Sequence, residues 1–404
     1  MDLRNYTIVT VSYWGFTLTD GALRMLVLLY FHGLGYSPVQ LAFLFLLYEF
    51  CGLVTNLLGG WIGSRVGLKA TLFAGLGTQI AALMALSFVQ SHWAALLSVL
   101  YVMAAQALSG IAKDLTKMSS KSAVKLLVPA GEGEAGAGRA LFKWVAILTG
   151  SKNAMKGMGF LLGGVLLGWL GFVTALWVMA GGLLLVLVGG LLGLRQDLGR
   201  SKVKVKFNQL FSKSREINLL SLARFFLFGS RDIWFVVGLP VFLKEKLGWS
   251  FAAVGGFMAA WIIGYGVVQA SAPGFLKRGG ARAALGWGGA LLLVTGALAL
   301  TVQLDFHVVG MVLGGLAVFG VVFAVNSAVH SYLILAYTDS DKVALNVGFY
   351  YMANAGGRLV GTLLSGLLYL GAGLSGCLWA SAGFVLVAVV LTAGLPREGK
   401  HEGA

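Results

Sequence analysis

Nine charged side chains lie inside stretches of the sequence that are otherwise apolar enough to cross a membrane. The cations are Arg24, Lys152, Lys156, Arg224, Arg231 and Arg358, and the carboxylates are Asp20, Glu49 and Asp232. Even on a lenient insertion scale, one charge at the bilayer centre costs roughly 2.5–3.5 kcal/mol. Nine such groups facing lipid would cost on the order of 20 kcal/mol or more. They must therefore face a cavity or one another.

Their spacing places them on shared helix faces, because residues four or seven apart lie on one side of a helix. The pairs related in this way are Asp20 with Arg24, Lys152 with Lys156, Arg224 with Arg231, and Asn354 with Arg358. Some of these charges can be structural ion pairs, with Asp20 neutralising Arg24 and Asp232 neutralising Arg231 or Arg224. Such pairing cannot neutralise all nine charges, because the cations outnumber the carboxylates by three.

An excess of cations at mid-membrane predicts an anionic ligand. Arginine suits phosphate and similar oxyanions, since its planar fork donates two parallel hydrogen bonds. We expect the ligand to contact a set drawn from both halves of the chain: Arg24, Lys152, Asn153, Lys156, Arg224, Arg231, Asn354 and Arg358. Asp20, Glu49 and Asp232 are candidates for charge pairing or proton coupling. Glu49 has no cation nearby in the sequence, and it is either a proton carrier or a protonated interhelical contact.

The elements that position these residues are membrane-spanning helices. The chain has 404 residues, of which 58% are hydrophobic and only 11% charged, too little polar surface for a soluble domain. Runs of about 20 apolar residues predict α-helical spans. We expect twelve, over 7–31, 38–60, 70–89, 93–112, 144–168, 172–194, 218–242, 250–274, 284–303, 307–337, 342–371 and 374–395. The predicted fold is thus an all-α polytopic membrane protein.

The net charge of +15 follows the membrane topology. Of the 30 Lys and Arg residues, 22 lie at the termini or in every second loop. By the positive-inside rule, both termini are cytoplasmic. We therefore expect a multi-pass membrane protein that binds no nucleic acid. A basic cytoplasmic linker at 195–217 divides an N-terminal six-helix bundle (1–194) from a C-terminal one (218–404).

The two halves repeat one another, which indicates a duplicated six-helix unit. An offset of 213 residues aligns "GYS" at 35–37 with "GWS" at 248–250, and "SRVGLK" at 64–69 with "KRGGAR" at 277–282. A second similarity between the halves pairs "KNAMKG" with "ANAGGR" and aligns Asn153 with Asn354.

A lysine stripe follows the fourth span, where Lys113, Lys117, Lys121 and Lys125 recur every four residues. Such a stripe either rests on acidic lipid headgroups or forms an electropositive vestibule that gathers anions from the cytosol. For the second reading, Lys113 and Lys117 are the vestibule residues.

The sequence shows no phosphate-binding GxxxxGK[ST] loop, no HExxH and no cluster of Cys and His. We expect no catalytic residues, no cofactor and no metal site. Cys51 and Cys377 are interpreted as small core residues. A membrane enzyme acting on lipid phosphates and a channel are the other classes, but the duplication disfavours the first and the scattered charges disfavour the second.

Twelve helices in two halves, a long basic linker and the loop "GGWIGSRVGLK" resemble the major facilitator superfamily. That loop is similar to the superfamily signature between its second and third helices, although Ser64 replaces the usual acidic residue before Arg65. The resemblance implies a secondary transporter that works by alternating access, normally as a monomer. In this superfamily, spans one, five, seven and eleven line the central cavity.

Longer stretches resemble the ArsJ-type organoarsenical efflux permeases over nearly the whole chain. They include "LTDGALRMLVLLYFHGLGYSP", "LLYEFCGLVTNLLGGWIGSR", "LTGSKNAMKGMGFLLGG" and "RFFLFGSRDIWFVVGLPVFL". This resemblance implies export of 1-arseno-3-phosphoglycerate, which a glyceraldehyde-3-phosphate dehydrogenase makes from arsenate, and hence arsenate resistance. The dehydrogenase would be a metabolic partner. The alternative within transporters is exchange of an ordinary organic phosphate for phosphate.

Overall fold

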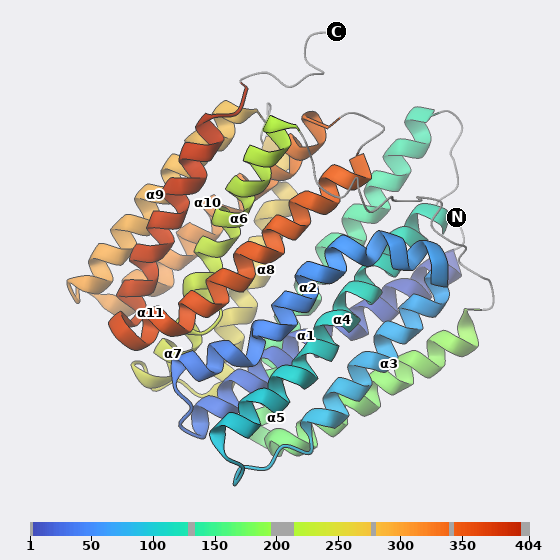
Figure 1. Ribbon diagram of the computed structural model, residues 1–404, viewed down its shortest axis with the longest axis horizontal. Helices are drawn as coiled ribbons and strands as arrows, with labels where there is room; N and C mark the ends of the chain where they lie inside the picture. The colour runs from blue at the N-terminus through green and yellow to red at the C-terminus, as the bar shows by residue number, and fades with distance from the viewer. Residues whose placement is uncertain (1–2, 128–133, 195–213, 276–279, 339–342, 397–404) are drawn as a thin grey trace. The chain divides into compact units, whose positions relative to one another are not determined.

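The computed structural model describes residues 3–127, 134–194, 214–275, 280–338 and 343–396, which form helices and short turns without a strand (Figure 1). An apolar helix satisfies its own backbone hydrogen bonds, as a bilayer requires. The helices are α1 (Leu3–Gly33), α2 (Pro38–Val66), α3 (Leu68–Leu86), α4 (Ala95–Leu127), α5 (Glu134–Gly193), α6 (Arg215–Phe235), α7 (Gly238–Glu245), α8 (Phe251–Phe275), α9 (Ala281–Gln303), α10 (Val308–Ala336) and α11 (Val343–Ala393). The predicted all-α membrane fold is confirmed.

Nine segments of the described chain are long and apolar enough to cross a membrane. Two of them, of 43 and 48 residues, are double length, and each is interrupted by a glycine with non-helical backbone angles. These glycines are Gly171 in α5 and Gly373 in α11, at the boundaries predicted between spans five and six and between eleven and twelve. The helix α1 falls outside this set because Asp20 and Arg24 lower its hydropathy. Counting α1, the described residues form twelve helical segments of spanning length.

The repeated "GYS" and "GWS" sequences are helix starts. Gly35 and Gly248 both have positive φ, 84° and 65°, a conformation that glycine adopts without steric cost. The Ser37 hydroxyl accepts a hydrogen bond from the Gln40 amide at 3.3 Å, and the Gln40 side chain accepts one from the Ser37 amide at 2.9 Å. This reciprocal capping box begins α2. The Ser250 hydroxyl caps α8 in the same way, accepting from the Ala253 amide at 3.2 Å.

The chain forms two compact units, and α2 and α8 contribute one part to each. Unit 1 contains Met1–Leu34, Val54–Val205 and Ser250–Ile263. Within it, α1 and α5 lie in direct backbone contact. A methyl group added to Gly21 would come 2.6 Å from the Lys156 carbonyl oxygen, and one on Gly159 would clash with the Leu18 carbonyl. Only glycine permits this approach, which is typical of packed membrane helices.

Unit 2 contains Gly35–Leu53, Lys206–Trp249 and Gly264–Ala404. Here α6 and α11 repeat the same close crossing. A methyl group on Gly361 would lie 2.7 Å from the Gly229 carbonyl oxygen, and one on Gly357 would clash with the Phe225 carbonyl. The first half of α2 also packs on α11, since a methyl group on Gly366 would come 2.7 Å from the Ala42 side chain. The two crossings agree with the duplication predicted from the sequence.

A short interruption at Val236 and Val237 separates α6 from α7. The Ser365 hydroxyl of α11 accepts hydrogen bonds from the Val237 and Gly238 amides, at 3.2 and 3.0 Å. These two N–H groups would otherwise be unpaired within an apolar segment, at a cost of about 1–3 kcal/mol each. The break in the helix is therefore supported by a neighbouring helix.

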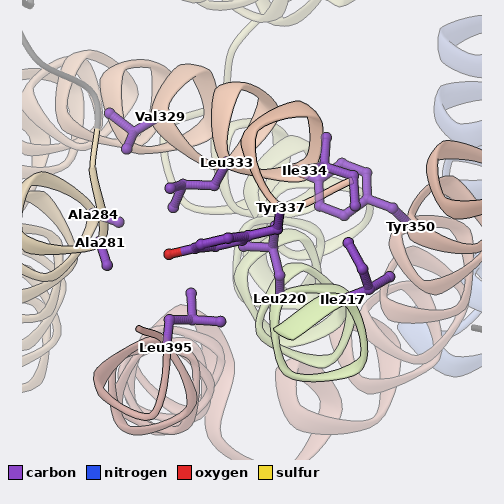
Figure 2. Packing of buried hydrophobic residues seen from close by; sticks show 10 residues of the cluster. All are labelled: Ile217, Leu220, Ala281, Ala284, Val329, Leu333, Ile334, Tyr337, Tyr350 and Leu395. Carbon is purple, nitrogen blue, oxygen red and sulfur yellow. The ribbon is translucent and has the colours of Figure 1, made fainter. Parts of the chain in front are cut away.

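The ends of α6, α9, α10 and α11 meet in an apolar core within unit 2. Figure 2 shows its ten residues: Ile217, Leu220, Ala281, Ala284, Val329, Leu333, Ile334, Tyr337, Tyr350 and Leu395. The Tyr337 hydroxyl donates to the Pro396 carbonyl at 2.8 Å. Tyr350 lies beside Ile334 in this view, and its fully buried ring also borders the site described below.

Several sequence predictions fall on residues outside the described part of the chain. These include residues 195–213 of the predicted linker and the side chains of 57–66, which carry most of the "GGWIGSRVGLK" loop. The side chains of Lys121 and Lys125 also lie outside it. The predicted domain boundaries at 194 and 218 stay predictions.

Candidate functional site

Arg224 is a buried cation in the middle of α6, with its side chain only 3% exposed. Its Nη1 donates to the Ser327 carbonyl and to the Ser327 hydroxyl, both at 3.1 Å. The guanidinium carbon lies 3.9 Å from the centre of the Phe228 ring and 5.0 Å from that of Tyr350. Cation–π contacts of this kind stabilise a charge by about 0.5–2 kcal/mol. None of these partners carries a negative charge.

The Nε atom of Arg224 has no hydrogen-bond partner among the described residues, and no ion pair to a carboxylate is formed there. An arginine fork binds carboxylate or phosphate through two parallel N–H donors. With Nη1 occupied by Ser327, the edge that includes Nε is the one left for a ligand. An anion on this edge would not have to break any of the contacts that hold Nη1.

Ser327 of α10 holds Arg224 in position. Its hydroxyl oxygen accepts from Gln269 Nε2 of α8 at 3.2 Å as well as from Arg224. Its carbonyl oxygen accepts from the Ser331 hydroxyl at 2.8 Å. Three helices of unit 2 therefore fix the orientation of one guanidinium. Neither Ser327 nor Gln269 was predicted from the sequence, because single polar residues in apolar helices usually indicate only interhelical packing.

Four other charged residues that were predicted within the helices of unit 2 contact one another in a network. Arg231 donates from Nε to Asp232 Oδ1 at 2.7 Å and pairs with the same oxygen through Nη2 at 2.5 Å. Arg358 donates from Nε to Asp232 Oδ2 at 3.1 Å and from Nη2 to Glu49 Oε1 at 2.7 Å. The two carboxylate side chains are each only 1% exposed. Two arginines and two carboxylates make this network electrically neutral.

The Phe228 ring contacts both Arg224 and Arg231, which belongs to the neutral network. The Phe228 ring lies 3.9 Å from the Arg224 guanidinium and 5.0 Å from that of Arg231. Because Asp232 pairs with Arg231 and Arg358, Arg224 supplies the one uncompensated positive charge among these five ionic groups of unit 2. The sequence-based alternative in which Asp232 neutralises Arg231 agrees with this geometry, and Arg358 is a second partner of the same carboxylate.

The predicted basic residues of unit 1 lie on the two helices that touch through glycine. Asp20 and Arg24 of α1 are buried, at 7% and 6% exposure. On α5, Lys152 and Lys156 are half-buried, and the Lys156 ammonium lies 5.7 Å from the centre of the Phe160 ring. The close crossing places Gly21, the residue after Asp20, against the backbone of Lys156 in α5.

The two predicted asparagines belong to separate units. Asn153 is half-buried in α5 of unit 1. Asn354 is 9% exposed in α11 of unit 2, and its Oδ1 has no hydrogen-bond partner among the described residues. Asn354 precedes Arg358 by one helical turn, so both residues lie on the same face of α11.

The predicted vestibule lysines lie beside an acid that sequence reasoning missed. Asp114 of α4 is 5% exposed and accepts a 2.5 Å hydrogen bond from the Thr55 hydroxyl. Lys117 donates to Asn56 Oδ1 at 2.9 Å and lies 3.7 Å from Asp114. Lys113 is half-buried one turn earlier. Asp114 lies just beyond the predicted end of span four at 112, whereas the helix α4 continues past it.

In the described part of the chain, no three His, Cys, Asp or Glu residues gather as they would to hold a metal ion. Neither Cys51 nor Cys377 forms a disulfide bond.

Comparison with known proteins finds one family model and several solved structures that are similar to this chain. The family model described as "Major Facilitator Superfamily" matches residues 220–403. A bacterial homologue of the iron transporter ferroportin in its inward-facing state aligns with a TM-score of 0.68, covering 97% of this chain and 98% of that one at 18% identity. A mutant form of the nucleoside transporter NupG aligns with a TM-score of 0.71, covering 96% and 98% at 14% identity. No curated protein sequence matches. At these identities the likeness shows the fold alone.

Proposed function

We propose that this protein is a secondary transporter of the major facilitator superfamily whose cargo is an organic anion with a phosphate-like oxyanion group. Two independent observations support the proposal. The fold is shared with transporters along nearly the whole chain, and the superfamily model matches the C-terminal half. The charged side chains within the helices include Arg224, a buried arginine with no anionic partner among the residues that the structure describes. The protein then works by alternating access in the bacterial inner membrane, with both termini in the cytoplasm.

The environment of Arg224 is the observation that supports an anionic cargo. A buried charge without a counterion is costly in a membrane, and such residues usually mark a substrate pathway. Ser327, Phe228 and Tyr350 hold the guanidinium in place but leave its charge unmatched. An incoming oxyanion supplies the missing charge and an acceptor for Nε. A neutral or cationic cargo does not supply the missing negative charge.

Within this class, the cargo we propose is 1-arseno-3-phosphoglycerate, exported to give arsenate resistance. The sequence resemblance supports this choice, and the substrate carries oxyanion groups at both ends that basic residues in both halves can bind. A glyceraldehyde-3-phosphate dehydrogenase supplies the substrate. Exchange of an ordinary organic phosphate for phosphate uses the same chemistry at Arg224, so the experiment must separate the two cargoes.

The test is arsenate tolerance of an arsenic-sensitive bacterial strain that expresses the dehydrogenase together with this protein. We expect tolerance and low cellular arsenic only when both proteins are present. Arg224→Ala abolishes tolerance, and Arg224→Lys retains part of it because a lysine keeps the charge but not the fork. Arg282→Ala, which removes an exposed arginine of the same unit, serves as the matched control and retains full tolerance.

Each result has a distinct consequence. Tolerance that survives Arg224→Ala in membrane-inserted protein would move the anion site away from Arg224. No tolerance with the intact, inserted protein would exclude the arsenical cargo. Phosphate counterflow in proteoliposomes then decides whether the wider class stands, since an anion carrier exchanges labelled phosphate and Arg224→Ala abolishes that exchange.

A further inference from the structure

His330 is a buried histidine of α10, three residues after the Ser327 that holds Arg224. Its side chain is only 1% exposed, and its Nδ1 atom has no hydrogen-bond partner within the described part of the chain. Buried polar atoms in folded proteins are nearly always hydrogen-bonded, so each exception calls for an explanation such as a ligand. Packing alone therefore does not account for this imidazole.

The side chain of His330 lies on the face of α10 that meets Arg224. Residues three and seven apart share a helix face, so His330 shares one with Ser327 and Phe323. Arg224 Nη1 contacts Ser327 at 3.1 Å. The Phe323 ring lies 5.2 Å from that of Phe228, which packs on the Arg224 guanidinium. His330 and Arg224 are close enough to interact electrostatically. His330 Nδ1 and Arg224 Nε therefore belong to one buried cluster of unit 2.

The charge of Arg224 determines what His330 can offer to a ligand. A second positive charge beside a buried arginine would be repelled, so the imidazole is neutral. A neutral imidazole has one N–H donor and one acceptor nitrogen. A proton on Nδ1 would be a buried donor without an acceptor beside a cation, whereas a lone pair on Nδ1 is attracted by that cation. The tautomer with its proton on Nε2 is therefore favoured, and Nδ1 is an acceptor.

The cluster thus combines a charged donor with a neutral acceptor. Arg224 Nε donates to an oxygen that carries negative charge, and His330 Nδ1 accepts from an O–H group. Sulfate offers only acceptors and would bring an oxygen lone pair against that of Nδ1. Hydrogen phosphate and hydrogen arsenate keep an O–H group of their own, and a hydroxyl next to an ionised group supplies the same donor. A site that hydrogen-bonds a substrate hydroxyl rejects an analogue without it, because a buried polar group is then left unpaired.

We propose that His330 is a specificity-determining residue of the anion site at Arg224, where its Nδ1 accepts a hydrogen bond from an O–H group of the cargo. The site then prefers oxyanions that carry an O–H group, on the oxyanion itself or on the attached organic part, over anions of the sulfate type. This inference rests on the proposed function and narrows its substrate class. The arseno-phosphoglycerate proposed above qualifies, because its glycerate chain carries a hydroxyl group.

The experiment compares two pairs of anions by calorimetric titration of the purified full-length protein. Hydrogen phosphate and sulfate have the same shape and, at mildly alkaline pH, the same charge, but only hydrogen phosphate has an O–H group. Isethionate and ethanesulfonate differ by one hydroxyl on the organic part. We expect the wild type to bind the O–H-bearing anion of at least one pair about ten- to hundredfold more tightly than its partner. The pair that shows this preference identifies which kind of O–H group His330 contacts.

Three substitutions separate specificity from structure. His330→Met removes the acceptor but keeps a large side chain, and it is expected to abolish the preference within the pair. His330→Asn keeps an acceptor near the position of Nδ1 and retains the preference. His307→Asn, at an exposed histidine of the same unit, is the matched control and behaves as the wild type. A substitution that only damaged the fold would weaken both anions of a pair alike and leave the ratio of their affinities unchanged.

Equal affinities within both pairs overturn the inference, and loss of that binding in Arg224→Ala then still supports the anion carrier. A preference that survives His330→Met also overturns the inference. Failure of the wild type to bind any of these anions removes the proposed function together with the inference.

If His330→Met does not fold, NMR spectra of the wild type with isotope-labelled histidine replace it. The preferred anion must then shift the Nδ1 resonance of a histidine that its partner anion leaves unshifted. Absence of such a difference overturns the inference.

Discussion

Gly361→Ala tests the close crossing of α6 and α11. Helix α6 contains Arg224, Arg231 and Asp232, and helix α11 contains Arg358. The added methyl group would lie 2.7 Å from the Gly229 carbonyl oxygen and 3.0 Å from Asp232 Cβ, whereas ordinary contacts begin at 3.4 Å. The helices must therefore separate locally by about 0.7 Å, the difference between 3.4 and 2.7 Å.

A gap of about 0.5–1 Å forfeits a quarter to a half of the dispersion attraction across it. Overpacking of this kind costs about 1–3 kcal/mol, and for a unit of this size each kcal/mol lowers the unfolding midpoint by about 2–4 °C. We expect Gly361→Ala to lower the midpoint of the detergent-solubilised protein by roughly 2–12 °C. The assay is the fraction of protein that remains monodisperse in size-exclusion chromatography after heating.

Gly348→Ala is the control, because it lies in the same half of α11 and a methyl group there has nothing within 4 Å. Replacing an uncrowded helical glycine by alanine stabilises a helix by roughly 0.5–1 kcal/mol. The two substitutions should thus shift the midpoint in opposite directions. A Gly361→Ala protein as stable as Gly348→Ala would refute the backbone contact between α6 and α11.

Two further substitutions probe the hydroxyl groups that support the site and the helix break. Ser327→Ala removes one hydrogen-bond acceptor of Arg224 and is expected to weaken phosphate binding on the order of tenfold. Unchanged affinity in calorimetric titration would contradict the positioning role. Ser365→Ala leaves the Val237 and Gly238 amides unpaired, at about 1–3 kcal/mol each, whereas Ser365→Thr keeps the hydroxyl; a lower unfolding midpoint for alanine alone is the expected result, and equal midpoints would argue against it.

The helices and the excess of buried cations could be read from the sequence because both depend on local patterns. Apolar runs predicted the spans, and the boundaries near 171 and 373 coincide with the glycines that interrupt α5 and α11. Arg224 and Arg231 share a face because they are seven residues apart on one helix. Asp232 was identified as a partner of Arg231 or Arg224 because it is adjacent in sequence.

Contacts between distant helices could not be predicted in this way. The partner of Glu49 is Arg358, 309 residues away, and no local spacing relates them. Ser327 and Gln269 were overlooked because nothing in an isolated apolar helix distinguishes a residue that orients an arginine from one that packs. Asp114 was missed for a different reason: it lies past the apolar run, although the helix continues and buries it.

The long separation of Glu49 and Arg358 also bears on how the protein is made. The helix α2 leaves the ribosome before the 309 residues that lead to its partner have been translated. Helix α2 must therefore enter the bilayer before Arg358 has been synthesised. Without that partner, the free energy of inserting Glu49 is lower when its carboxyl group is neutral. The first half of α2 reaches its final packing only after α11 has been synthesised. Assembly of unit 2 is thus completed at the end of translation, and truncated chains that lack α11 should remain open to membrane quality-control proteases.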